Sequence, residues 1–458
     1  MGEARRRVVI VGLARQGKAL ARHFADQGAE VVVTDLRSRE ELHRAVDELA
    51  DLPLEFVLGG HPDDLVARAD LLCLSGGVPA DLPLAQQARA RGIRVTNDSQ
   101  LFLEACPARS IGITGSAGKT TTTALLGEMA RRWAETSGRR AWVGGNIGRP
   151  LLSDLAAIAP DDLVVMELSS FQLELMTVGP SIAVVLNVTP NHLDRHRTME
   201  AYVAAKRRIL DFQTGADTAV LGVDDAGAWA LRSHVRGRLL GFGTRLPDGV
   251  DGAMLDGESI VVRMDGAERV IAPRSSVRLR GEHNLWNVLA ACAAAAAGGL
   301  PIPAVAEAIA GFRGVPHRLE FVRHVRGADW YNDSIATTPE RSIAAMRSFD
   351  EPLVLLAGGR DKDLDWSDFA RLVRQRVDHL ILFGEARRKI AAAVGSLRHG
   401  ERPETIDEAA GLRQAVEIAA RRVAPGDVVL LAPGGTSFDE FVDFAERGER
   451  FRAWVEEL

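Results

Sequence analysis

Residues 112–123, GITGSAGKTTTT, combine glycines, a lysine and hydroxyl side chains in an order suited to binding phosphate groups. A short apolar run precedes them and a helical pattern follows, which predicts a strand, a loop and a helix. Gly115 and Gly118 would let backbone N–H groups face the phosphates. Lys119 would supply a fixed positive charge, and Thr120 a hydroxyl ligand for Mg²⁺. We therefore predict an ATP- or GTP-binding loop, in preference to a glycine turn with an incidental lysine.

The spacing inside this loop differs by one residue from the commonest phosphate-loop pattern. In that pattern a glycine stands five places before Gly118, whereas this chain has Ile113 there. The loop indicates a nucleotide site, but the use made of the phosphate has to be inferred from other residues.

Three further residues stand where a phosphate site would use them. Glu167 directly follows an apolar strand, where a carboxylate can serve a magnesium ion. His192 follows the next apolar strand, and Lys206 falls on an expected helix. From the pattern alone, a structural histidine and a solvated lysine are the ordinary interpretations of the last two.

The amino-terminal segment, RVVIVGLARQGKALARHFADQGAEVVVTD, predicts a strand, a glycine turn, a helix and a second strand. A dinucleotide-binding fingerprint needs a middle glycine, and this chain has Ala14 between Gly12 and Gly17, which disfavours NAD binding. Asp35 could accept hydrogen bonds from a ribose or a base, and Arg37 could contact a phosphate. The alternative is a plain βαβ unit with a tight turn and a solvated acid.

The elements that must position these residues form three β/α segments in a chain of 458 residues, too long for one core. Apolar runs alternate with helical patterns throughout, which predicts an α/β fold with parallel sheets in all three segments. We expect a Rossmann-like domain at 1–98, a central P-loop ATPase-like domain at 99–314 and a Rossmann-like carboxyl-terminal domain at 315–458. The alanine-rich run at 288–300 predicts a buried helix that ends at Gly298 and Gly299.

Composition excludes several classes of protein. The chain is 46% hydrophobic and 26% charged with a net charge of −6, and its basic residues are spread out, so neither nucleic acid nor a membrane surface is expected as a partner. Its apolar runs are too short for a signal peptide or a membrane span. The three cysteines, Cys73, Cys106 and Cys292, lie far apart and indicate neither disulfides nor a zinc site. We expect a monomer in a reducing cytosol.

Ten motifs together resemble one family, the Mur ligases, ATP-dependent amide-bond synthetases of peptidoglycan assembly. The resemblance covers nearly the whole chain from about residue 8 and is closest to the members that add D-glutamate. In order, the motifs are GITGSAGKTTTT, VGGNIGRPL, MELSSFQLE, NVTPNHLDRH, YVAAKRRIL, GEHNLWNVLAA, GVPHRLE, NDSIATTPERS, GGRDK and TSFDEF.

This resemblance implies a role for each matching residue. ATP phosphates would lie on Gly115, Ser116, Ala117, Gly118, Lys119, Thr120 and Thr121. The adenosine side would be contacted by Asn284, Asn287, Arg318 and Asp333. Two Mg²⁺ sites would use Thr120, Glu167, His192 and Lys206, with Lys206 converted by CO₂ into a carbamate. The UDP-N-acetylmuramoyl-L-alanine substrate would lie on Leu13, Ala14, Asp35, Arg37, Asn146 and His192, and the incoming glutamate on Thr337, Lys362, Ser437 and Phe438.

The implied reaction transfers the γ-phosphate of ATP to the alanyl carboxylate, after which the amino group of glutamate displaces phosphate from the acyl phosphate. Two departures from the family pattern leave L-glutamate open as the acceptor: Ile335 stands where many members have lysine, and APGGTSF at 432–438 replaces a more usual wording. Another Mur or folylpolyglutamate-type ligase is the further alternative. A non-catalytic relative would be expected to lose Lys119, Glu167, His192 or Lys206.

Overall fold

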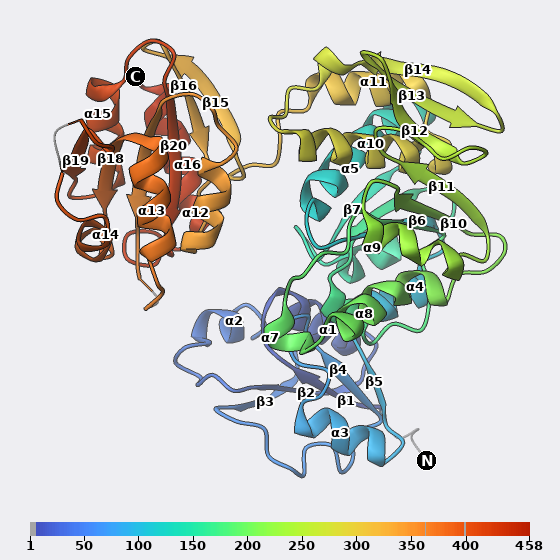
Figure 1. The fold of residues 1–458 in the computed structure, drawn as a ribbon. Helices are drawn as coiled ribbons and strands as arrows, with labels where there is room; N and C mark the ends of the chain where they lie inside the picture. Colours follow the sequence, from blue (N-terminus) through green and yellow to red (C-terminus); the bar gives the residue numbers. More distant parts are fainter. Residues whose placement is uncertain (1–5, 362, 398–399) are drawn as a thin grey trace, which may run out of the picture. The chain divides into compact units, whose positions relative to one another are not determined.

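The computed structural model describes residues 6–361, 363–397 and 400–458, and it has the mixed α/β architecture with three sheets that the sequence predicts (Figure 1). Backbone contacts group the chain into two compact units. One runs through Arg278 and includes Glu282–Phe312, and the other comprises Leu279–Gly281 and Arg313–Leu458. The first unit holds two sheets and the second holds one. The domain boundaries at 98 and 314 stay predictions.

The amino-terminal sheet is parallel throughout, in the strand order β3-β2-β1-β4-β5. Its central strands are apolar runs because helices cover both faces of a parallel sheet. The elements of this region are β1 (Arg7–Val11), α1 (Arg15–Asp26), β2 (Glu30–Asp35), α2 (His43–Asp47), β3 (Leu54–Leu58), β4 (Leu71–Leu74), α3 (Pro83–Ala90), β5 (Arg94–Thr96) and α4 (Asp98–Ala105).

The central sheet has nine strands in the order β14-β13-β12-β11-β10-β9-β6-β8-β7. Its strands are β6 (Arg109–Thr114), β7 (Ala141–Gly145), β8 (Leu163–Glu167), β9 (Ile182–Val185), β10 (Thr218–Gly222), β11 (Arg238–Phe242), β12 (Asp251–Asp256), β13 (Ser259–Met264) and β14 (Ala267–Pro273). Its helices are α5 (Lys119–Ser137), α6 (Ser170–Leu173), α7 (Leu193–His196), α8 (Met199–Asp211), α9 (Ala226–Ala230), α10 (Glu282–Gly298) and α11 (Ile302–Gly311), with the short 3₁₀ segments η1 (Leu151–Ala157), η2 (Leu231–His234) and η3 (Arg274–Ser276).

The third sheet, in the second unit, has the order β15-β16-β20-β17-β18-β19. Its elements are β15 (Glu320–Val325), β16 (Ala328–Asn332), α12 (Pro339–Met346), β17 (Leu353–Gly358), α13 (Ser367–Arg376), β18 (Val377–Phe383), α14 (Arg387–Val394), β19 (Thr405–Glu408), α15 (Leu412–Arg422), β20 (Val428–Gly434) and α16 (Phe444–Glu456).

The expectation of wholly parallel sheets is wrong for the second and third sheets. Strands β12, β13 and β14 pair antiparallel, as do β15 and β16. The reason is local, because two-residue turns join these strands: Asp265 and Gly266 have φ of 54° and 77°, and Arg326 and Gly327 have φ of 56° and 81°. Two successive residues with positive φ form the hairpin turn that matches strand twist.

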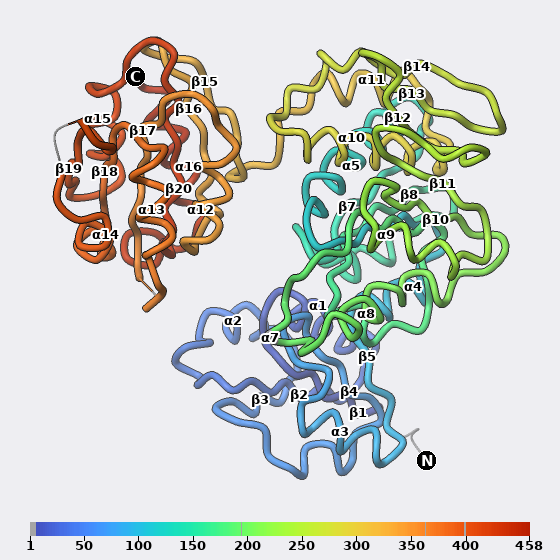
Figure 2. Tube along the Cα trace, in the orientation of Figure 1, coloured from blue at the N-terminus to red at the C-terminus, as the bar shows by residue number. Residues whose placement is uncertain are grey.

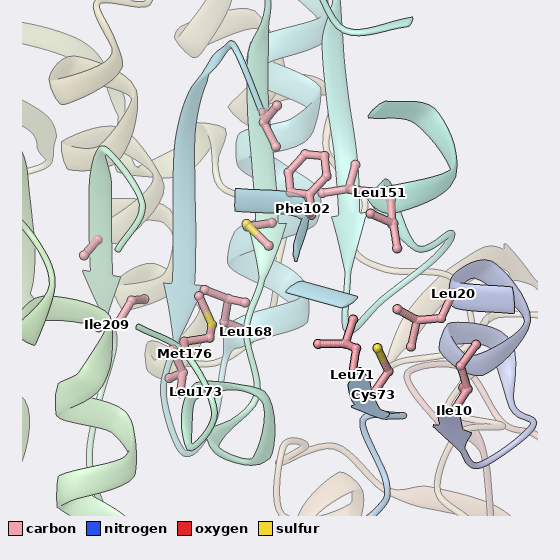
Figure 3. Packing of buried hydrophobic residues seen from close by; sticks show 14 of the residues in the cluster. Ile10, Leu20, Leu71, Cys73, Phe102, Leu151, Leu168, Leu173, Met176 and Ile209 are labelled. Atoms are coloured by element: carbon pink, nitrogen blue, oxygen red, sulfur yellow. The ribbon is translucent and has the colours of Figure 1, made fainter. Parts of the chain in front are cut away.

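One hydrophobic core joins the two sheets of the first unit. Side chains of β1, α1 and β4, among them Ile10, Leu20 and Leu71, belong to the same buried cluster as Leu168 and Met176 of the central region (Figure 3). Helix α10 is buried as predicted and packs against α5 and the strands β9–β13, a path that can be followed in Figure 2. The amino-terminal and central sheets therefore share one hydrophobic core.

A buried carboxyl group lies at the start of α4. Asp98 is 3% exposed, and its Oδ1 has no hydrogen-bond partner among the described residues. Burial raises the pKa of Asp98 to about 7. Because its pKa is higher in the folded chain than in the unfolded chain, this group favours folding most at acidic pH and loses that contribution as pH rises through 7.

We expect Asp98→Asn to stabilise the protein at pH 8 by about 2 kcal/mol, because the variant removes a buried negative charge. At pH 5 only about a third of that gain should remain. Thermal unfolding of both proteins across pH 5–8 measures the effect, and an equal gain at both ends would contradict a buried carboxyl that titrates near neutrality.

Candidate functional site

The loop between β6 and α5 needs its glycines for space as well as for backbone angle. Gly118 has φ 82°, and a Cβ there would lie 2.2 Å from Oδ1 of Asn287. A Cβ at Gly115 would lie 2.9 Å from Cβ of Leu186. The loop therefore passes close to β9 and α10, and the N-terminus of the 19-residue helix α5 opens directly behind it.

The side chain of Asn187 holds the middle of this loop, a role the sequence did not suggest. The Ala117 N–H donates to Oδ1 of Asn187 (2.8 Å), and the Ser116 N–H donates to the backbone carbonyl of Asn187 (3.0 Å). Helix α5 begins at Lys119, directly after this loop. Helix N-termini of this kind attract anions.

Two lysines converge on one backbone carbonyl at the loop. Nζ of Lys119 lies 2.8 Å and Nζ of Lys206 lies 2.9 Å from the carbonyl oxygen of Gly115. Lys206 comes from α8 and is 1% exposed, with its Nζ 4.6 Å from the ring centroid of Tyr202. The Tyr202 hydroxyl donates to Oγ of Ser116 (3.0 Å). The solvated-lysine interpretation of Lys206 is thus wrong.

Burial and the neighbouring charge of Lys119 lower the pKa of Lys206 to about 6. A neutral amine is the form of lysine that acts as a nucleophile. One feature of the sequence could have indicated this arrangement: Tyr202 stands four residues before Lys206, so both side chains lie on the same face of α8.

Glu167, at the end of β8, collects the polar groups expected around a hard cation. The Thr120 hydroxyl donates to Oε2 of Glu167 (2.9 Å), and the Asn146 amide donates to Oε1 (2.8 Å). Among the described residues no three His, Cys, Asp or Glu side chains gather into a metal cage. A carboxylate and a hydroxyl beside a phosphate loop fit Mg²⁺, which takes few protein ligands and completes its shell with phosphates and water.

His192 lies beside Phe171 at the start of α7. Its backbone has φ 53°, and the two ring centroids are 5.2 Å apart. His196 also packs against Phe171. It is buried, its ring stacks on that of Phe171 at 5.3 Å between centroids, and it contacts Ser170 (2.9 Å) and Glu174 (3.0 Å). Phe171, Glu174 and His196 line a cavity of ≈ 400 Å³, together with Pro79, Ala80, Asp81, Arg89, Arg195, Arg197 and Ala201.

The two asparagines of α10 lie beside the loop. Oδ1 of Asn287 accepts from the Thr122 hydroxyl (3.3 Å), and the Asn287 amide donates to Oδ1 of Asn284 (3.0 Å). The structure therefore brings both predicted adenine-side residues next to the phosphate loop.

The amino-terminal turn brings Leu13, Asp35 and Arg37 together. Oδ2 of Asp35 accepts from the Leu13 N–H (2.8 Å) and from Nη2 of Arg37 (2.8 Å). Burial acts to raise the pKa of Asp35, but hydrogen bonds from Arg37 and Leu13 outweigh it and lower the pKa to about 2. Ala14, the N-cap residue of α1, stands beside this group. Asp35 is 6% exposed, so the interpretation as a solvated acid is wrong.

In the second unit, Asp333 follows β16 with its carboxyl largely buried. Oδ1 accepts from the Leu319 N–H (3.0 Å), and burial raises the pKa of Asp333 to about 6. The neighbouring Arg318 favours its ionised form. Both predicted nucleotide contacts of this unit therefore lie together.

Three of the residues predicted for the amino acid, Thr337, Ser437 and Phe438, lie on the loops after β16 and β20. Thr337 is half-buried, Ser437 is buried and Phe438 is 60% exposed, whereas Lys362 lies outside the described residues. The segment 432–438 begins inside a strand, because β20 continues to Gly434.

Comparison with known proteins agrees with this geometry. Three family models match successive parts of the chain: the Mur ligase MurD-like N-terminal domain at residues 6–97, the Mur ligase middle domain at 113–295, and the Mur ligase glutamate ligase domain at 317–435. The chain belongs to the Mur ligase family, as the sequence predicts.

Within that family, the chain resembles proteins named UDP-N-acetylmuramoylalanine--D-glutamate ligase. The one from Symbiobacterium thermophilum is 43% identical and the one from Geotalea uraniireducens 40%, each over 99% of this chain and 98% of the relative. Among solved structures, the UDP-N-acetylmuramate-alanine ligase MurC of Thermotoga maritima has a TM-score of 0.56 at 20% identity, over 98% of this chain and 99% of that one, which supports the fold. In the part of the chain described, no helix has the length and apolar character needed to cross a membrane.

Proposed function

We propose that this chain is an ATP-dependent ligase that joins D-glutamate to UDP-N-acetylmuramoyl-L-alanine. The observation that carries the proposal is that Lys119 and the buried Lys206 both donate to the Gly115 carbonyl. Next to this loop, the Thr120 hydroxyl donates to Glu167. The names of the relatives, at about 40% identity along the whole chain, support the choice of substrates.

The chemistry begins with activation of a carboxylate, which is a poor acyl donor. The γ-phosphate of ATP passes to the alanyl carboxylate, and the amine of D-glutamate then attacks the acyl phosphate and expels phosphate. Lys119 and the helix N-terminus offset negative charge that spreads over the phosphoryl oxygens. Placing the reacting groups in line supplies most of the remaining acceleration.

Magnesium and a carbamate are part of the proposal. Thr120 and Glu167 would hold Mg²⁺ between the phosphates of ATP, and Lys206, once carbamylated, would offer an anionic oxygen to a second ion together with His192. When bound, the metal supplies charge neutralisation for the phosphate groups. The contact between Thr120 and Glu167 and the low pKa of the Lys206 amine support these assignments.

The remaining assignments follow from the same proposal. Leu13, Ala14, Asp35 and Arg37 would bind the uridine diphosphate, Asn146 and His192 the sugar-peptide end, and Thr337, Lys362, Ser437 and Phe438 the glutamate. ATP would contact residues 115–121, Asn284, Asn287, Arg318 and Asp333. We propose a cytoplasmic monomer.

The test supplies the purified protein with UDP-N-acetylmuramoyl-L-alanine, ATP and Mg²⁺, together with D- or L-glutamate. Phosphate release and product mass are measured in each reaction. We expect one glutamyl residue to be added and one phosphate released per ATP with D-glutamate only. Turnover with L-glutamate and none with D-glutamate would overturn the assignment of D-glutamate as the acceptor. Phosphate release without a new product would overturn the assignment of ligase activity.

Asp35→Ala should weaken the binding of the sugar-nucleotide substrate and leave the binding of ATP unchanged. The Asp35 carboxylate holds Arg37 and the Leu13 N–H in place, so its loss should raise the KM for UDP-N-acetylmuramoyl-L-alanine by about tenfold or more. Steady-state kinetics with each substrate varied in turn measures the change. An equal rise in the KM for ATP would show that the variant disturbs more than this site.

A further inference from the structure

Arg447 is a fully buried charged side chain in the second unit, and it links two loops. It comes from α16 and is 0% exposed. Its Nε donates to Oγ of Ser334 (2.9 Å) and its Nη2 to the Ser334 carbonyl (2.8 Å), while its Nη1 donates to the Gly435 carbonyl (3.1 Å). One guanidinium therefore ties the loop after β16 to the loop after β20, two neighbouring strands of the sheet.

A third loop, after β17, lies against the same guanidinium. A Cβ at Gly359 would lie 2.8 Å from Nη1 of Arg447, so glycine is required where the loop passes. This loop is also paired with the β20 loop, because Arg360 and Thr436 exchange two backbone hydrogen bonds (2.8 and 3.0 Å). Arg447 thus sits beneath the loops that follow three adjacent strands, β16, β20 and β17.

The partners of Arg447 are backbone and hydroxyl oxygens instead of carboxylates. Within the described residues it forms no ion pair, and a buried cation is expensive unless its hydrogen bonds are satisfied. Burial lowers the pKa of Arg447 to about 10, against the opposing influence of Asp439 and Glu440, so the group stays charged at neutral pH. A guanidinium has the fixed fork of donors needed to bridge several carbonyls, which an ammonium lacks.

We propose that Arg447 is a positioning residue that holds these three loops as one rigid receptor for the incoming dicarboxylate amino acid. The inference rests on the proposed function, because Thr337 and Ser437 are assigned to that amino acid and stand on the loops after β16 and β20. Arg447 acts through the loops and does not contact the substrate. Removing it loosens the pocket while leaving the UDP-substrate site of the first unit intact.

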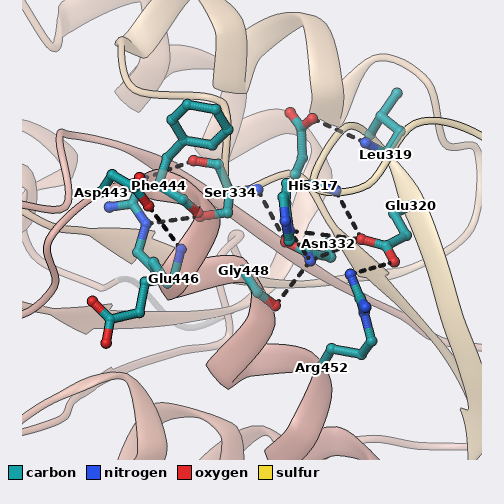
Figure 4. A network of polar contacts seen from close by, with 12 residues as sticks. His317, Leu319, Glu320, Asn332, Ser334, Asp443, Phe444, Glu446, Gly448 and Arg452 are labelled. Atoms are coloured by element: carbon teal, nitrogen blue, oxygen red, sulfur yellow. Dashed lines mark hydrogen bonds and ion pairs between the residues drawn. The ribbon is translucent and has the colours of Figure 1, made fainter. Parts of the chain in front are cut away.

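A second arginine of the same helix provides a matched control. Arg452 pairs with Glu320 (3.0 Å), and Glu320 accepts from the Asn332 amide (3.0 Å), which also donates to the Gly448 carbonyl (3.1 Å) (Figure 4). This network fastens α16 to the β15–β16 hairpin without touching the β17 or β20 loops. Arg452→Met should therefore change the helix contact and leave the loops after β17 and β20 as they are. The loop after β16 is not part of this control, because the Ser334 N–H donates to Oδ1 of Asn332 (3.1 Å).

The experiment compares hydrogen exchange in the wild type, Arg447→Met, Arg447→Lys and Arg452→Met, all as the full chain without ligand. We expect exchange at 333–338, 358–361 and 434–438 to be at least about tenfold faster in both Arg447 variants. Exchange at 358–361 and 434–438 should be unchanged in Arg452→Met. The KM for D-glutamate should rise at least about tenfold in both Arg447 variants, with the KM for the UDP substrate within about twofold of wild type.

Three results would overturn the proposal: unchanged exchange in the three loops, an equal rise across the whole unit, or an Arg447→Lys variant that matches the wild type. The last would mean that charge alone suffices. If the wild type does not use D-glutamate, the proposed function fails, but the exchange data still decide whether Arg447 holds the loops.

Discussion

Lys206→Ala is expected to lose ligase activity by about a thousandfold or more, with partial recovery when formate or acetate is added. The alanine variant removes the amine that would carry the carbamate, and a small carboxylate can occupy the vacated space and supply an anionic oxygen. Phosphate release and product mass, measured with and without added acid, report the loss and the recovery.

Arg207→Ala is the matched control for this prediction. It changes the next residue of α8, whose side chain pairs with Asp211 at 3.1 Å and is 38% exposed. Because an exposed ion pair contributes little, this variant should keep its activity within about twofold. Full activity of Lys206→Ala would contradict the carbamate. Loss without any recovery would leave the hydrogen bond from the Lys206 amine to the Gly115 carbonyl as the cause.

Glu167→Gln is expected to lower kcat by about a thousandfold and to raise the Mg²⁺ concentration needed for half-maximal rate. The amide has the size of the carboxylate and can still accept from Asn146 or Thr120, so the fold around β8 should survive. What disappears is the negative charge that a hard cation requires. A magnesium titration of phosphate release measures both effects.

The control for Glu167→Gln is Glu135→Gln, on the exposed part of α5. This change should leave both the rate and the magnesium dependence as in the wild type. A Glu167→Gln variant whose magnesium dependence equals that of the wild type would contradict the assignment of Glu167 to the metal.

Local patterns predicted the secondary structure on either side of the loop at 115–118 well. The sequence placed Lys119 and Thr120 at the start of a helix and Glu167 at the end of a strand, because these positions depend on neighbours along the chain. The burial of Lys206 depends instead on α8 packing beside the loop, which comes 91 residues earlier. Periodicity alone could not distinguish it from a solvated helix lysine.

Contacts between distant segments were also the ones that sequence reasoning missed. Asn187 holds Ala117 from 70 residues away, and Arg447 holds Ser334 from 113 residues away. An asparagine after a strand and an arginine on an amphipathic helix carry no signal of such partners. By contrast, the antiparallel hairpins had a readable signal in the Asp265–Gly266 pair, because that dipeptide suits a turn with two positive φ angles.

An isotope-transfer measurement tests whether this chain transfers the γ-phosphate of ATP to a substrate carboxylate or to water. UDP-N-acetylmuramoyl-L-alanine labelled with ¹⁸O in both oxygens of its alanyl carboxylate is turned over with ATP, Mg²⁺ and D-glutamate, and the released phosphate is analysed by mass. If the γ-phosphate is transferred to the carboxylate, each phosphate should carry one ¹⁸O atom from the substrate. Phosphate free of ¹⁸O, formed together with ADP, would show that the loop serves hydrolysis by water and would contradict the acyl-phosphate reaction.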